Sequence, residues 1–218
     1  MKNTNEYLIP IVNMATLENY YREDYTTKGR LIESIGQQFL KLYNFNTVPI
    51  TTKLLQKTQG DTVGTMVIPN LANKQATIEF KSGCNYNGYN ELCIDLEYFT
   101  KEGLPYANSG TNIGWLFTTV SDFIITVVPK TKKLYFMNWY NGLHSTLIRA
   151  YSLFMDNIEP LPSWAWATID LITIDKNKNT KVLRLNLDKL IEEFPEFISE
   201  YKLIGMDEYC NILEKELA

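Results

Sequence analysis

The run of residues 123–128 constrains the fold more than any other part of the sequence. It reads Phe-Ile-Ile-Thr-Val-Val, so apolar side chains occupy both odd and even positions. Because successive side chains of a strand point to opposite faces, this pattern predicts a strand that is buried on both faces. A sheet that contains such a strand needs packed elements on each side. We therefore expect an α/β or α+β domain with a central mixed sheet flanked by helices.

Other helical and strand patterns surround this run. The clearest helix is predicted over residues 26–43, where apolar residues recur at helical spacing and Thr26 or Thr27 can form the N-cap. Strands are predicted over residues 48–52, 61–68, 76–81, 91–98 and 134–139, with a hairpin of 167–174 and 181–187. The remaining predictions are helical: 17–22, a turn at 116–119, 143–155, and a tail from Asp188 that breaks near Pro195 and Gly205.

All 218 residues are expected to form one domain, because the sequence contains no repeat, linker or low-complexity tract. A chain of this length can bury a sizeable core. No stretch approaches the roughly 20 apolar residues that are needed to cross a bilayer. Residues 1–11 lack the basic start and apolar run of a signal peptide. We therefore expect a cytoplasmic protein with no membrane partner.

Histidine and cysteine are scarce, which excludes several kinds of catalytic site. The chain has one histidine, His144, and three cysteines without CxxC spacing, Cys84, Cys93 and Cys210. These residues do not supply the four ligands of a structural zinc site, and histidine-based nucleases and Ser-His-Asp hydrolases are also disfavoured. We expect the cysteines to be reduced, and buried or incidental. Hydrolysis by this chain would depend on carboxylates, lysine and a hard metal ion.

The net charge of −4 is a weak argument against a nucleic-acid partner, since phosphate contacts need Lys or Arg. Acidic metal ligands contribute to this total, but they do not repel DNA once a divalent ion is bound. Lysines also cluster locally, at Lys53 and Lys57, at residues 130–133 and at residues 176–181. Net charge therefore does not exclude DNA binding.

The segment 76–81 places a carboxylate and an ammonium group on one strand face. Glu79 and Lys81 are two residues apart and project to the same side, while Ile78 and Phe80 project into the core. Asp61 begins the preceding predicted strand. If the two strands pair, Asp61 comes close to Glu79, and a divalent ion would relieve the repulsion between the two carboxylates.

This arrangement has the parts that phosphodiester hydrolysis requires. Asp61, Glu79 and the main-chain carbonyl of Phe80 are the candidate ligands of Mg²⁺, for which Mn²⁺ can substitute. The ion would lower the pKa of a bound water, and Lys81 would orient or deprotonate that water. The alternative interpretation is a solvated strand face with an ordinary Glu–Lys ion pair, and the Glu-x-Lys pattern by itself does not exclude it.

Several segments resemble the PD-(D/E)XK, or restriction-endonuclease-like, nucleases, particularly small phage and bacterial enzymes similar to Holliday-junction resolvases. The matching segments occur in the family's order and are residues 28–33 (KGRLIE), 59–61 (QGD), 77–81 (TIEFK), 90–98 (NELCIDLEY), 109–110 (SG), 118–123 (TTVSDF) and 134–136 (LYF). Residues 26–139 would form the nuclease core and residues 140–218 a C-terminal extension of a hairpin and helices.

The resemblance implies a metal-dependent endonuclease that hydrolyses DNA in recombination, restriction or phage DNA processing. Glu33 would assist beside the metal, and a homodimer that cuts both strands is consistent with the family. Candidate DNA contacts are Lys57, Lys101, Asn112 and Trp115.

One departure from the family leaves a second hypothesis open. Many relatives have a second acidic residue two positions after the motif aspartate, and here that position is Val63. The fold could therefore persist without catalysis, as a module that binds nucleic acid or inhibits another protein. A third hypothesis is a scaffold protein in which Glu79 and Lys81 form only a surface ion pair.

Overall fold

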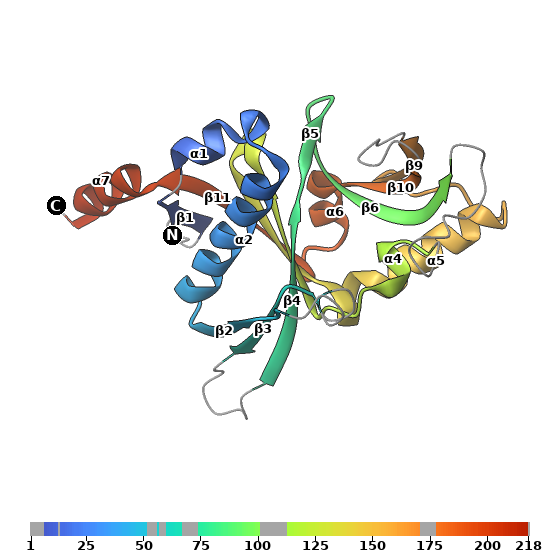
Figure 1. The fold of residues 1–218 in the computed structure, drawn as a ribbon, viewed down its shortest axis with the longest axis horizontal. Helices are drawn as coiled ribbons and strands as arrows, with labels where there is room; N and C mark the ends of the chain where they lie inside the picture. Colours follow the sequence, from blue (N-terminus) through green and yellow to red (C-terminus); the bar gives the residue numbers. More distant parts are fainter. Residues whose placement is uncertain are drawn as a thin grey trace.

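The computed structural model describes residues 7–12, 14–51, 56, 60–66, 74–100, 113–170 and 178–217. Within these ranges the chain forms a mixed α/β structure with two sheets (Figure 1). The larger sheet has seven strands in the order β1-β11-β8-β7-β4-β3-β2, and the smaller has four in the order β5-β6-β10-β9. Every helix in this part of the chain is too short or too polar to span a lipid bilayer.

The seven-stranded sheet is mixed, because β4 and β7 run parallel while β3 and β8 are antiparallel to them. Its strands are β1 (Leu8–Ile11), β2 (Phe45–Pro49), β3 (Thr62–Met66), β4 (Lys74–Ser82), β7 (Phe123–Val128), β8 (Lys133–Asn138) and β11 (Ile198–Gly205). β7 lies at its centre, and five of its six side chains are fully buried. Ile124 and Val128 belong to one hydrophobic core, and Ile125 and Val127 to another. This confirms the prediction of a strand covered on both faces.

Helix α2 (Tyr25–Leu42) covers one face of this sheet, together with the short α1 (Met14–Glu18) and a 3-10 turn at Tyr20–Arg22. The helix begins at Tyr25, one residue earlier than predicted, because its N-cap is Asp24 and not a threonine. The Asp24 carboxylate accepts both the backbone N–H and the hydroxyl of Thr27. A carboxylate suits this position, since it satisfies a free N–H group and interacts favourably with the helix dipole.

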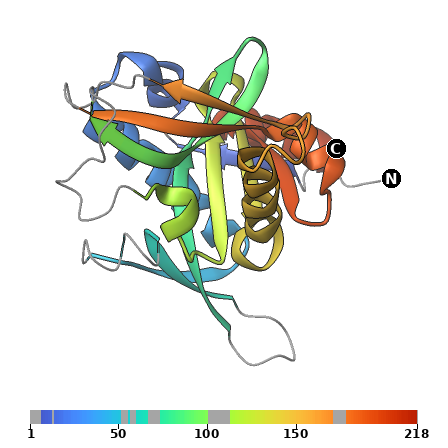
Figure 2. The ribbon, with the colours of Figure 1, turned by 90° about the vertical axis from the view of Figure 1, so that its right-hand side faces the viewer.

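The smaller sheet covers the other face and lies on the viewer's side of β7 in Figure 2. It contains β5 (Cys84–Tyr86), β6 (Tyr89–Thr100), β9 (Ala165–Asp170) and β10 (Lys178–Asn186). Leu92, Ile94 and Leu96 of β6 share a core with the fully buried Trp139. The helices on this side are α4 (Trp115–Thr118), α5 (His144–Met155), which follows a π-helical turn at Trp139–Leu143, and α6 (Leu187–Glu193).

The C-terminal region differs from the prediction. Residues 198–205 form strand β11 and not helix, and only α6 and α7 (Met206–Leu217) are helical in this tail. β11 pairs antiparallel with β8 and parallel with β1, a strand that the sequence did not reveal. Leu203 and Ile204 become buried by this pairing. Backbone pairing with two strands of the sheet thus outweighs the weak local preference of a Glu- and Lys-containing segment for helix.

Two glycines of α2 provide a matched test of its packing against β4. A Cβ atom on Gly36 would overlap the ring of the buried Phe80, whereas a Cβ on Gly29 would meet nothing within 4 Å. We expect Gly36→Ala to lower the free energy of unfolding by about 1–3 kcal/mol through overpacking. Gly29→Ala should raise it by up to about 1 kcal/mol through helix propensity. Urea denaturation of the two variants measures both effects, and equal effects would contradict the close approach of α2 to β4.

Candidate active site

A cavity of about 280 Å³ lies between α2 and the edge of β4, at the point where β3 begins. It is lined by residues from three separate parts of the chain. These are Tyr20, Tyr25, Lys28, Gly29, Ile32 and Glu33 from the 3-10 turn and α2, Asp61 before β3, and Glu79, Phe80, Lys81 and Ser82 from β4. All four candidate catalytic residues therefore border one cavity.

Asp61 is held at the open edge of β4 by two main-chain hydrogen bonds. Its N–H donates to the carbonyl of Ile78 at 2.9 Å, and its Oδ2 accepts the N–H of Phe80 at 2.8 Å. The N–H and C=O of one strand residue point to the same edge, so the carbonyl of Phe80 also points to the edge where Asp61 lies. The expected pairing of the two strands is observed, with Thr62 opposite Ile78.

Gly60 makes this approach possible. It has a φ of +89°, a conformation that other residues rarely adopt. A Cβ atom there would come within 2.6 Å of the hydroxyl of Ser121 and 2.8 Å of the carbonyl of Ile78. Any side chain at this position would push Asp61 away from β4.

The side chains of β4 alternate as the sequence predicts. Ile78 and Phe80 enter the core beneath α2, while Glu79 and Lys81 face the other way and form an ion pair. Glu79 is only 7% exposed, and Lys81 remains partly accessible. The ammonium of Lys81 lies 4.6 Å from the ring centroid of Trp115, which fixes it between a carboxylate and an aromatic face.

Burial raises the pKa of both inner carboxyl groups. For Glu79, loss of hydration is the main cause, while Lys81 lowers the pKa and Asp61 raises it. For Asp61, loss of hydration again dominates, opposed by the Phe80 hydrogen bond and by Lys81. Glu33 is exposed at the rim, where partial loss of hydration and then the charge of Asp61 raise its pKa. Loss of hydration thus disfavours the charged form of all three acids, and a bound cation would favour it.

The groups at this edge fit a hard divalent ion. Asp61, Glu79 and the Phe80 carbonyl could supply oxygen ligands, and Mg²⁺ ordinarily keeps several waters in addition. In the described ranges, no three Asp, Glu, Cys or His side chains at this cavity have ligand atoms within 4.8 Å of one another. The ligand set of Asp61, Glu79 and the Phe80 carbonyl, with Glu33 assisting, stays a prediction.

Other predicted residues take different places. Trp115 begins α4 and contacts Lys81, so it lies beside the candidate site. His144 bonds through Nε2 to the carbonyl of Leu116 at 2.7 Å, which is a structural role. Lys57, Lys101 and Asn112 lie outside the described residues.

The sequence did not single out Tyr20, Tyr25 or Lys28 as cavity residues. Tyr20 donates a hydrogen bond to the hydroxyl of Ser82 at 2.8 Å, and the ammonium of Lys28 lies 5.6 Å from the centroid of the Tyr20 ring. Lys28 lies four residues before Ile32 but five before Glu33, so helical spacing from Glu33 does not indicate Lys28. Nothing local in the sequence indicates that Tyr20 approaches β4.

Comparison of the chain with family models, with curated proteins and with solved structures finds no match in any of the three.

The raised pKa of Glu79 leads to a prediction about stability. In the metal-free protein the folded state retains the Glu79 proton to higher pH than the unfolded state, so ionisation near neutral pH costs folding free energy. We expect Glu79→Gln to raise the melting temperature at pH 7. The gain should shrink as the pH falls, and it should vanish below the ordinary pKa of 4.5, where Glu79 becomes protonated in both states.

Thermal unfolding in a chelating buffer, scanned against pH, measures this effect. Glu18→Gln is the matched control, because Glu18 also pairs with a lysine, Lys132, but on the surface. It should give no such gain. A lower melting temperature for Glu79→Gln at pH 7 would show that the carboxylate stabilises the metal-free fold.

Proposed function

We propose that the protein is an Mg²⁺-dependent deoxyribonuclease of the PD-(D/E)XK, restriction-endonuclease-like class, which cleaves DNA endonucleolytically. The observation that carries this proposal is the convergence of Asp61, Glu79, Lys81 and the Phe80 carbonyl at one open strand edge. They come from β4 and from the residue that precedes its partner strand β3, and each would have a role in phosphodiester hydrolysis.

The arrangement of the core supports a nuclease fold of this class. Helix α2 precedes three antiparallel strands, β2, β3 and β4, and the next strand of the sheet, β7, is parallel to β4. Asp61, Glu79 and Glu33 border one cavity where β3 and β4 separate. Glu33 reaches the same cavity from α2, as the resemblance implies.

The side chains suggest how a phosphodiester would be bound and attacked. A divalent ion at Asp61, Glu79 and the Phe80 carbonyl would lower the pKa of water and offset charge on the phosphate. The Lys81 ammonium, held by Glu79 and Trp115, would orient the attacking water and stabilise negative charge on the phosphorus oxygens. Lys28, at the rim, would contact an adjacent phosphate of the backbone.

Plasmid cleavage with Mg²⁺ or Mn²⁺ tests the proposal. We expect Lys81→Met, Glu79→Gln and Asp61→Asn each to reduce the rate by at least about 100-fold, as loss of a proton-transfer or metal-binding group does. Lys133→Met is the matched control. Lys133 has nearly the same exposure as Lys81, 32% against 30%, and also pairs with a glutamate, but it lies on β8 away from the cavity. Its substitution should leave cleavage unchanged.

A second candidate is a nuclease fold that binds DNA without cutting it. Val63 favours this candidate, because it lies two residues beyond Asp61 in β3, where a further carboxylate would face the same side. Plasmid and oligonucleotide assays separate the two candidates. The protein could retard DNA in a gel without cleaving it, in either metal and with supercoiled, linear and branched DNA. That result would overturn the catalytic proposal and support binding alone.

A further inference from the structure

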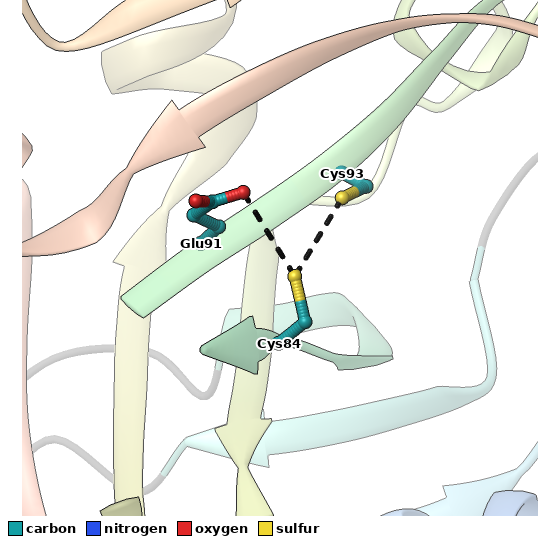
Figure 3. A group of neighbouring side chains, drawn as sticks. All are labelled: Cys84, Glu91 and Cys93. Carbon is teal, nitrogen blue, oxygen red and sulfur yellow. Dashed lines mark hydrogen bonds between the residues drawn. The ribbon is translucent and has the colours of Figure 1, made fainter. Parts of the chain in front are cut away.

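A second group of potential metal ligands lies on the β5–β6 hairpin, outside the candidate active site. Cys84 pairs directly with Glu91 across the two strands, and Cys93 lies two residues beyond Glu91 on the same face of β6. The three side chains point toward one another (Figure 3). The two sulfur atoms are 3.9 Å apart, and the Cys84 sulfur is 3.9 Å from Oε2 of Glu91.

We propose that Cys84, Cys93 and Glu91 bind a thiophilic divalent ion of the zinc class. Zinc–sulfur bonds of about 2.3 Å in tetrahedral geometry place two sulfur ligands roughly 3.8 Å apart, and a carboxylate oxygen roughly 3.5 Å from each sulfur. All three ligand atoms lie within 4.8 Å of one another. They are the only such group of Cys, His, Asp and Glu ligands in the part of the chain that is described.

The charges around this group also suit a divalent ion. Glu91 is fully buried, and its Oε2 pairs with Arg184 of β10 at 3.0 Å. Two thiolates and one carboxylate carry three negative charges. A divalent ion and the guanidinium carry three positive charges, so the completed site would be neutral despite its burial. Without Arg184, the same ligand set would leave one uncompensated negative charge.

The strand register argues against a disulfide between the cysteines. Cys84 stands opposite Glu91, so Cys93 is its diagonal neighbour. Diagonal neighbours in antiparallel strands have Cα atoms roughly 7–8 Å apart, beyond the usual reach of a disulfide at about 4.4–6.8 Å. An ion can bridge that separation without moving the backbone.

Three protein ligands would leave the fourth position of a tetrahedral ion to solvent. Cys84 and Cys93 are half-buried, and Glu91 borders a cavity of about 270 Å³ that Tyr86, Asn186 and Lys189 also line. The ion would join β5 to β6 where the chain leaves β4 through Gly83. Its sulfur ligands distinguish it from the oxygen-lined site at Asp61, which favours Mg²⁺.

Cobalt(II) titration of the reduced, full-length protein tests this proposal without reference to nuclease activity. We expect one Co²⁺ per chain to produce thiolate-to-cobalt charge-transfer absorption and the visible bands of a tetrahedral centre. Zinc should then displace the cobalt and remove both features. Cys84→Ser and Cys93→Ser should each abolish or weaken the charge-transfer band. Where a band remains, the affinity for Co²⁺ should be at least about 10-fold lower. Cys210→Ser, which alters the exposed third cysteine, is the matched control and should retain it.

Two measurements keep the test independent of folding defects and of the other site. Asp61→Asn should leave the cobalt spectrum unchanged, because Asp61 belongs to the oxygen-lined cavity. In the wild-type protein, Zn²⁺ should protect two of the three thiols from a thiol reagent, and a chelator should restore their reactivity.

Any of three results would overturn the proposal. These are the absence of a thiolate band in the reduced wild-type protein, an unchanged band in either Cys84→Ser or Cys93→Ser, and reaction of all three thiols at an undiminished rate with Zn²⁺ present.

Discussion

The hydrogen bond from the Phe80 N–H to the Asp61 carboxylate is the interaction on which the candidate site depends. Strand β3 stops pairing with β4 at Ile78, so the next N–H on that edge would otherwise lack a strand partner. A buried N–H without a partner costs free energy comparable to a lost hydrogen bond. The carboxylate replaces the missing strand, and this requirement fixes Asp61 beside Glu79. Gly60 allows the chain to turn closely enough for the bond to form.

Packing on both sides of β4 holds the charged groups in place. Ile78 and Phe80 are buried beneath α2, and Gly36 brings the helix against the Phe80 ring. The strand is therefore rigid where Glu79 and Lys81 emerge on the opposite face. A rigid strand can keep partly dehydrated carboxylates near one another. The packing of the core on each side of the sheet offsets the folding free energy that their repulsion costs.

One continuous stretch of chain connects two groups of ligands with different chemistry. β4 contributes the Glu79 carboxylate and the Phe80 carbonyl, beside Asp61, which precedes β3, and β5, which begins two residues after Ser82, contributes the sulfur of Cys84. Oxygen ligands favour Mg²⁺ and thiolates favour zinc-class ions. The two groups would therefore select different metals even though they lie close along the chain. Gly83 joins β4 to β5, and a side chain there would collide with Val128 and the carbonyl of Glu91.

The sequence by itself determined the features that depend on local periodicity. These include the doubly buried strand β7, the helix α2, and the alternation that puts Glu79 and Lys81 on one face. Only the tertiary structure decided which distant segments meet. β11 is a strand because β1 and β8 pair with it, and Tyr20 and Lys28 border the cavity because α2 crosses β4. Cys84 and Cys93 approach each other because the register of β5 against β6 places Cys84 opposite Glu91. Register depends on pairing between strands, and the local pattern of residues does not specify it.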